Sequence, residues 1–84
     1  MPEVVIYSTT ICPYCVRAKM LLQRKGVPYE EVDVSGDADA RRALMERTRQ
    51  RTVPQIFING EHIGGCDELY ALERAGQLDT KLSA

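Results

Sequence analysis

The chain has 84 residues, of which 44% are hydrophobic and 27% charged, with a formal net charge of −1 at pH 7. These values are typical of one soluble domain, and we expect it to span residues 1–84. No apolar run approaches the roughly 18 residues of a membrane-spanning helix, and no export leader is recognisable, so a cytoplasmic protein without a membrane partner is expected. The near-neutral charge gives no reason to expect nucleic acid as a partner.

A Cys-x-x-Cys motif lies between the first two expected elements. Residues 4–7 are apolar and β-prone, residues 16–25 carry helical periodicity, and Cys12-Pro13-Tyr14-Cys15 stands between them. Pro13 suits the first helical position, where a missing N–H costs nothing. We therefore expect Cys12 at the helix N-cap and Cys15 on the inward face.

A second strand and a second helix follow. Gly26 and Pro28 end the first helix, and residues 29–34 alternate as a strand, which completes a βαβ unit. Residues 38–48 form a helical pattern with Ala40, Leu44 and Thr48 on one stripe.

The last part of the chain predicts a hairpin and a final helix. Residues 53–58 and 61–64 read as strands joined by a type I′ turn at Asn59-Gly60. Asp67 is expected to be the N-cap of a third helix that ends at Gly76, and Leu78 and Leu82 suggest one more short helical turn. The expected order is βαβαββα.

The position of Cys12 favours a thiolate. A helix N-terminus is worth roughly 0.3–1 kcal/mol to an anion, which alone lowers a thiol pKa by at most about one unit, so hydrogen bonds must add to it. The N–H groups of Tyr14 and Cys15 are the expected donors. Because a low pKa reduces nucleophilicity while it raises the thiolate fraction, its main benefit is to make Cys12 a good leaving group.

The three motifs of the chain, taken in order, resemble those of a dithiol glutaredoxin of the small bacterial type. They are Cys12-Pro13-Tyr14-Cys15, Thr52-Val53-Pro54 before a strand, and Gly64-Gly65-Cys66-Asp67 before a helix. The resemblance implies an α/β, thioredoxin-like fold with a four-stranded mixed sheet, built from a βαβ unit and a β-hairpin and flanked by three or four helices. It also implies Cys12 as the nucleophile and Cys15 as the resolving cysteine.

The resemblance further implies a glutathione site at matched positions. Its residues would be Tyr14, Arg41, Thr52, Val53, Pro54, Gly65, Cys66 and Asp67. Pro54 would be cis, and the Val53 backbone would pair with the cysteinyl part of glutathione. The N–H groups of Cys66 and Asp67 would bind the γ-glutamyl carboxylate, the Asp67 carboxylate would bind the α-ammonium, and Arg41 would contact the glycyl carboxylate.

One position departs from the family pattern. Thr9 stands where many glutaredoxins have a lysine that pairs with the glycyl carboxylate. A threonine supplies no charge, so we expect weaker glutathione binding than in relatives that have the lysine. Cys66 is expected to be a small buried residue rather than a catalytic one.

The implied activity is glutathione-dependent reduction of protein disulfides and glutathione mixed disulfides. Glutathione would be a co-substrate, with no permanently bound cofactor and no metal. The implied partners are disulfide-bonded or glutathionylated proteins, ribonucleotide reductase among the candidates, with glutathione reductase acting indirectly through glutathione. A monomer is expected.

Three alternatives stay open at the level of sequence. Cys12, Cys15, Cys66 and an exposed His62 make a nominal zinc set. An iron–sulfur scaffold bridged by the active-site cysteine and glutathione is a second, although Pro13 and Tyr14 argue against it. A redoxin reduced by thioredoxin reductase is the third.

Overall fold

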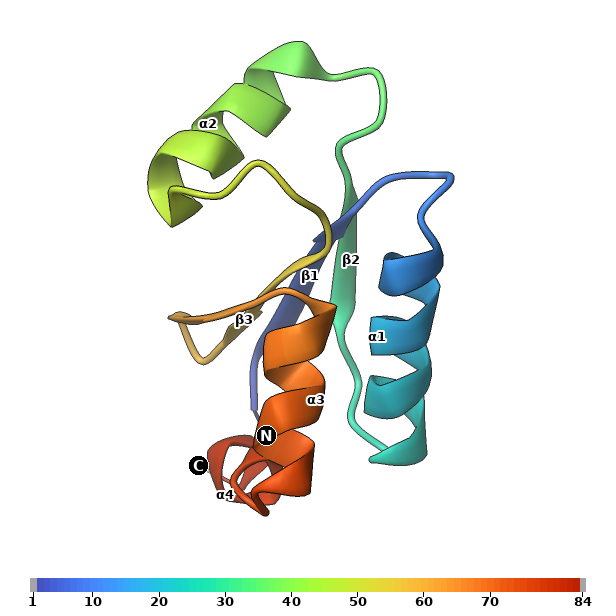
Figure 1. The fold of residues 1–84 in the computed structure, drawn as a ribbon, viewed down its shortest axis with the longest axis vertical. Helices are drawn as coiled ribbons and strands as arrows, with labels where there is room; N and C mark the ends of the chain where they lie inside the picture. Colours follow the sequence, from blue (N-terminus) through green and yellow to red (C-terminus); the bar gives the residue numbers. More distant parts are fainter. Residues whose placement is uncertain (1, 84) are drawn as a thin grey trace.

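The computed structural model describes residues 2–83, which form a four-stranded sheet and four helices (Figure 1). In chain order the elements are β1 (Val4–Ser8), α1 (Pro13–Arg24), β2 (Glu30–Asp33), α2 (Ala38–Thr48), β3 (Gln55–Ile58), β4 (Glu61–Gly64), α3 (Cys66–Arg74) and α4 (Leu78–Leu82). The expected thioredoxin-like α/β fold is confirmed, and the short turn of helix at the C-terminal end is present as α4.

The sheet is mixed and has the strand order β2-β1-β3-β4. β1 is parallel to β2, whereas β3 is antiparallel to both β1 and β4. Tyr7, near the end of β1, pairs with Gln55, the first residue of β3. The loop that leaves β1 and the loop that enters β3 therefore lie at the same end of the strands.

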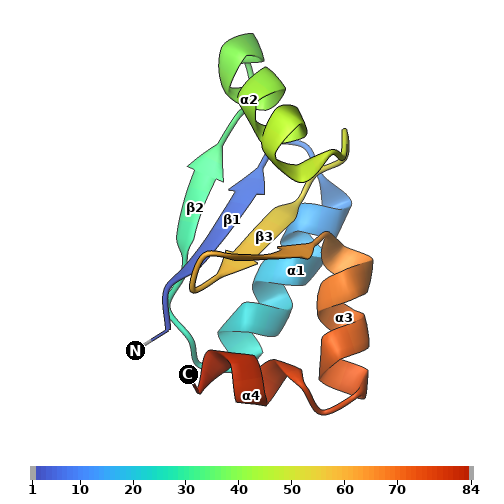
Figure 2. The same cartoon turned by 90° about the vertical axis from the view of Figure 1, so that its left-hand side faces the viewer.

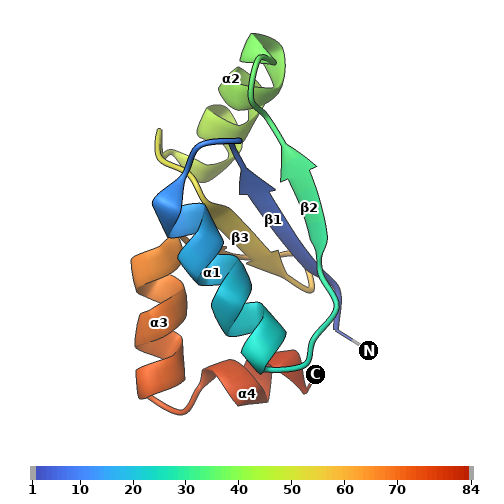
Figure 3. The same cartoon turned by 90° about the vertical axis from the view of Figure 1, so that its right-hand side faces the viewer.

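Helices cover both faces of the sheet. α1 and α3 lie side by side on one face (Figure 3), where Leu22 and Leu69 join Ile6 and Ile56 in the buried core. α2 lies on the opposite face, towards the end at which β1 and β2 finish (Figure 2). It is tied to the sheet by Arg47, whose guanidinium carbon lies 4.0 Å from the centroid of the Phe57 ring.

The hairpin turn forms as the sequence predicts. Asn59 has a φ of 51° and Gly60 a φ of 82°. Positive φ at both central residues is the requirement of a type I′ turn, and an Asn-Gly pair meets it with the least strain.

The start of α3 differs from the sequence prediction, which was wrong about Asp67. The N-cap is Gly65, and Asp67 is the second residue of the helix. The Glu68 carboxylate accepts a 2.6 Å hydrogen bond from the Gly65 N–H. Because this carboxylate caps the helix from within the first turn, no N-cap side chain is needed and the helix begins earlier than expected. None of the helices within residues 2–83 has the length and apolar character needed to cross a bilayer.

Candidate active site

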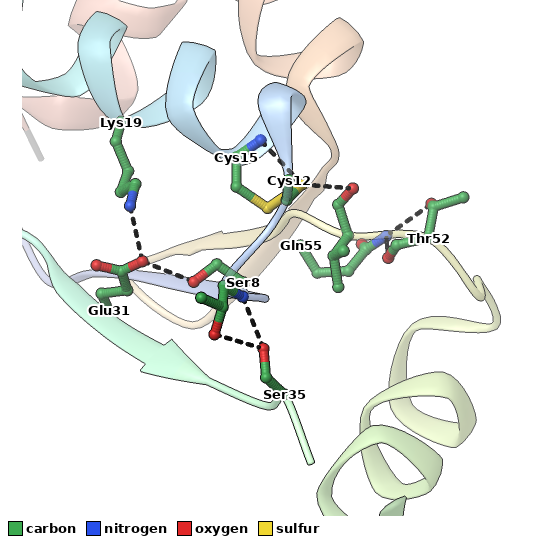
Figure 4. Close-up of a disulfide and its surroundings, with 10 residues drawn as sticks. Ser8, Cys12, Cys15, Lys19, Glu31, Ser35, Thr52 and Gln55 are labelled. Atoms are coloured by element: carbon green, nitrogen blue, oxygen red, sulfur yellow. Dashed lines mark hydrogen bonds and ion pairs between the residues drawn. A yellow bond between two sulfur atoms is a disulfide. The ribbon is translucent and has the colours of Figure 1, made fainter. Parts of the chain in front are cut away.

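The Cys-x-x-Cys motif opens α1. Cys12 is the N-cap and Pro13 the first helical residue, as the sequence predicts. Cys12 and Cys15 form a disulfide (Figure 4), with their Cα atoms 5.2 Å apart. The Cys15 N–H donates a 3.1 Å hydrogen bond to Cys12 Sγ. Of the two expected donors, the structure of residues 2–83 shows this one and no bond from the Tyr14 N–H.

The two cysteines differ in accessibility. Cys12 is 9% exposed and Cys15 is 1% exposed. Cys15 lies on the inward face of α1 together with Ala18 and Leu22. An incoming disulfide therefore reaches Cys12 more readily, while Cys15 waits behind it within bonding distance.

The loop before Cys12 is anchored to the loop after β2. The Thr10 N–H donates a 2.6 Å hydrogen bond to Ser35 Oγ. Ser35 is in turn held by Asp33, whose Oδ1 accepts its N–H at 2.8 Å. The Ser35 N–H and hydroxyl lower the pKa of the Asp33 carboxyl, so this anchor is charged at neutral pH.

A groove of about 400 Å³ lies beside the motif. Three chain segments line it, namely the start of α1, the loop before β3 and the start of α3. The lining residues are Tyr14, Gln50, Thr52, Val53, Pro54, Gly65, Cys66, Asp67 and Glu68. The fold thus brings together every residue that the sequence suggested for glutathione except Arg41.

The segment before β3 forms the part of the groove wall that lies next to Cys12 Sγ. The Val53–Pro54 peptide is cis, as the resemblance implied. Val53 O lies 3.7 Å from Cys12 Sγ, although the two residues are 41 positions apart in the sequence. The backbone at Val53 therefore forms the wall nearest to the reactive atom.

Arg41 lies apart from this groove. It is partly buried in the first turns of α2 and is absent from the groove lining. A second cavity of about 430 Å³ lies along α2 and is lined by Arg42, Met45, Glu46, Arg49, Gln50 and Arg51. Gln50 lines both cavities, so the basic surface of α2 adjoins the groove without forming it.

Two groove residues were missed by the sequence analysis. Glu68 stands three residues after the N-cap Gly65, which is the spacing of a capping-box acid and could have signalled its position. Gln50 has no such local signal. It reaches the groove only because the chain turns back from the end of α2 towards β3.

Cys66 lies in the groove wall but is 5% exposed. Burial raises the pKa of its thiol, which opposes thiolate formation at neutral pH. What Cys66 offers a ligand is its backbone at the first position of α3, where helix N–H groups are free to bind an anion.

The nominal zinc set is not assembled. The expectation that His62 is exposed was wrong, since its side chain is partly buried and its Nε2 lies 2.7 Å from Gln55 Oε1. Within residues 2–83 no three His, Cys, Asp or Glu side chains converge as metal ligands would. His62 instead belongs to a hydrogen-bond network on the α2 side of the sheet.

Residues 4–63 match the family model for glutaredoxins. The chain is 57% identical over 84 residues to a glutaredoxin of Pseudomonas aeruginosa, with all of both chains covered. It is 51% identical over 82 residues to glutaredoxin 3 of Escherichia coli, covering 98% of this chain and 99% of that one.

Solved structures that resemble this chain are also glutaredoxins. The crystal structure of a buckwheat glutaredoxin–glutathione complex matches with a TM-score of 0.91 and 39% identity, over 98% of this chain and 77% of that one. A solution structure of a glutaredoxin from Brucella melitensis matches with a TM-score of 0.86 and 51% identity, over 95% and 87% of the two chains. Neither the family nor these neighbours favour the alternative activities. The chain belongs to the glutaredoxin family and is a glutathione-dependent thiol–disulfide oxidoreductase.

Proposed function

We propose that this protein reduces glutathione mixed disulfides and protein disulfides, with Cys12 as the nucleophile, Cys15 as the resolving thiol and glutathione held in the groove beside them. The observation that carries the proposal is the contact of 3.7 Å between Cys12 Sγ and Val53 O. It puts the more accessible sulfur at the end of a groove that has room for a peptide-like ligand.

In the monothiol reaction the Cys12 thiolate attacks the glutathione sulfur of a mixed disulfide. A Cys12–glutathione disulfide forms and the substrate leaves as a thiolate. A second glutathione thiolate then attacks the sulfur of the bound glutathione, which releases glutathione disulfide and restores the Cys12 thiolate. The Cys15 N–H bond to Cys12 Sγ stabilises the leaving group in this step.

In the dithiol reaction Cys12 attacks one sulfur of a protein disulfide. Cys15 then attacks Cys12 Sγ, which releases the reduced substrate and leaves the Cys12–Cys15 disulfide present in the structure. Two glutathione molecules reduce this disulfide and leave as glutathione disulfide. Only this reaction requires Cys15.

The groove supplies the groups that a tripeptide with two carboxylates and one ammonium needs. Val53 offers backbone hydrogen-bonding groups, and the start of α3 offers the N–H groups of Cys66 and Asp67 for the γ-glutamyl carboxylate. The exposed Asp67 carboxylate is the partner for the α-ammonium. Tyr14 would lie alongside the ligand, and Arg41, outside the groove wall, would act on the glycyl carboxylate only by reaching across from α2.

The test is a glutathione-coupled mixed-disulfide assay on the wild type, Cys12→Ser and Cys15→Ser. We expect Cys12→Ser to be inactive and Cys15→Ser to retain monothiol activity. Coupling to thioredoxin reductase without glutathione should give no turnover. Equal loss of activity in both cysteine variants would rule out the proposed roles.

We propose a monomer in a reducing compartment such as the cytoplasm, because turnover depends on a reduced glutathione pool. The protein substrates are to be identified by trapping, since Cys15→Ser strands the mixed disulfide between Cys12 and its partner. Recovery of ribonucleotide reductase by this route would support it as a substrate. Its absence from the trapped proteins would exclude it from the candidate substrates.

A further inference from the structure

Gln55 is a fully buried polar residue whose side chain is hydrogen-bonded to the loop before β3. Its exposed fraction is 0%. Its Nε2 donates one hydrogen bond of 2.9 Å to Thr52 O (Figure 4) and another of 2.9 Å to Gln50 Oε1. Both hydrogens of the amide are therefore used to tie the first strand residue to two residues that line the groove.

The bond to Thr52 O also determines where the next N–H points. Thr52 O and the Val53 N–H belong to one peptide unit, and this unit is trans. In a planar trans peptide the C=O and N–H point in opposite directions. Because the Thr52 carbonyl is turned towards Gln55, the Val53 N–H is turned away from Gln55. Among residues 2–83 that N–H has no hydrogen-bond partner, and Val53 lines the groove.

Thr52 O decides which way round the Gln55 amide lies, and His62 supports that orientation. His62 Nε2 is 2.7 Å from Gln55 Oε1, and the ring packs against Phe57 with the two centroids 5.1 Å apart. An amide turned the other way would set Oε1 against Thr52 O, with two acceptors in contact. With Nε2 towards Thr52, Oε1 faces His62 Nε2, which donates to it in the tautomer that carries its hydrogen on Nε2. The orientation with Nε2 towards Thr52 is therefore the one in which the amide nitrogen, the amide oxygen and each of their partners are satisfied.

We propose that Gln55, supported by its hydrogen bond to His62, is a positioning residue that aims the Val53 N–H into the groove as a donor for a backbone carbonyl of the bound glutathione. The inference rests on the proposed function. It adds a chain of hydrogen bonds that runs from His62 on β4, through Gln55 on β3, to the loop beside Cys12. Gln55 and His62 themselves need not touch the ligand.

The experiment measures binding of S-methylglutathione, which keeps the tripeptide backbone and both carboxylates but has no thiol to exchange. Affinity is measured by calorimetry, and the amide signals of Val53, Cys66 and Asp67 are followed by NMR during the titration. Gln55→Met keeps the size of the side chain and removes its hydrogen bonds. His62→Phe keeps an aromatic ring beside Phe57 and removes only the donor to Gln55.

For Gln55→Met we expect S-methylglutathione to bind roughly five- to thirtyfold more weakly, as for loss of one oriented hydrogen bond. The ligand-induced shift of the Val53 amide should be lost while the shifts of Cys66 and Asp67 persist. His62→Phe should weaken binding by about two- to fivefold, because Gln50 and Thr52 still restrain the amide. The control Ile56→Val also alters a fully buried β3 residue, but on the other face of the sheet, and should bind as the wild type does.

Unaltered affinity and an unaltered Val53 shift in Gln55→Met would overturn the inference. So would the loss of all three amide responses together, since that would mean general damage to the groove. If Gln55→Met does not fold, His62→Phe decides by the same two measurements. Absence of any response in the wild type would instead overturn the proposed function itself.

Discussion

The backbone N–H of Cys15 donates its hydrogen bond to the sulfur of Cys12, three residues earlier, at 3.1 Å. The sulfur thus takes the place that a serine or aspartate oxygen usually occupies at a helix N-cap. A thiolate gains more from this position than a disulfide sulfur does, because the donor and the helix dipole both favour negative charge. The arrangement therefore assists the step in which Cys12 leaves.

Glutathione should release Cys12 from its glutathione mixed disulfide faster than it releases an ordinary surface cysteine. The hydrogen bond and the helix dipole both stabilise the Cys12 thiolate, and part of this stabilisation lowers the barrier for its departure. The expected ratio of the two release rates is roughly 5- to 30-fold. The measurement is the rate of deglutathionylation of Cys15→Ser at pH 7. The comparison is Ala71→Cys in a Cys12→Ser, Cys15→Ser background, which places a thiol on the exposed side of α3. Equal rates would contradict the leaving-group argument.

Thr9→Lys should lower the Michaelis constant for glutathione by about two- to fivefold, the worth of one solvent-exposed ion pair. Thr9 lies in the loop between β1 and Cys12, and the wild-type side chain offers only a neutral hydroxyl. The effect should shrink as salt is added, since the new attraction is screened. Ala71→Lys adds the same charge away from the groove and should change nothing. A Michaelis constant that stays the same or rises in Thr9→Lys would show that the charge at this position is unimportant.

Cys66 should react slowly with alkylating reagents. Its side chain is 5% exposed and burial raises the pKa of the thiol, so both access and thiolate fraction are low at neutral pH. In Cys12→Ser, Cys15→Ser protein, iodoacetamide at pH 7.5 should modify Cys66 at least about tenfold more slowly than it modifies the same chain in urea. Because Cys66 would serve glutathione through its backbone, Cys66→Ala should keep the wild-type Michaelis constant within about twofold. Fast alkylation of the folded protein would show an accessible, reactive thiol instead.

Glu31 should make the fold sensitive to acid. Its Oε2 accepts hydrogen bonds from Lys19 Nζ at 2.9 Å and from Ser8 Oγ at 2.7 Å, which joins α1, β1 and β2 (Figure 4). The Lys19 ammonium, followed by the Ser8 hydroxyl, lowers the pKa of the Glu31 carboxyl. A lowered pKa in the folded state means that the stabilisation is present above the unfolded pKa and is lost as pH falls through the folded value.

The expected loss for Glu31 is less than about 1 kcal/mol, since the pair is partly exposed to solvent, and it sets in as the pH falls from about 5 through the ordinary glutamate pKa of about 4.3. Urea unfolding of Glu31→Gln over this range should show a smaller decrease in the free energy of unfolding than the wild type does. Glu30→Gln, which changes an exposed glutamate in the same strand, should decrease as the wild type does. Identical pH dependence in the wild type and Glu31→Gln would show that the ion pair adds nothing.

The order of elements and the identity of the reactive pair were determined by the sequence, because each depends on neighbouring residues. Alternation, helical periodicity and the Asn59-Gly60 turn act over a few positions, and Pro13 after Cys12 places a thiol at a helix start without help from the rest of the chain. The family motifs added the cis peptide before Pro54, which no local rule would have required.

The tertiary structure alone decided how the groove is closed and held. Val53 meets Cys12 across 41 positions because β1 and β3 are antiparallel neighbours, and Gln50 enters the wall because the chain returns from α2. Glu68 rather than Asp67 caps α3, since a free carboxylate one turn in reaches the Gly65 N–H. His62 and Gln55 are polar residues in strands, with no pattern to mark them. Their role follows from burial, because a buried amide has to find partners for all its polar atoms and here those partners shape the binding loop.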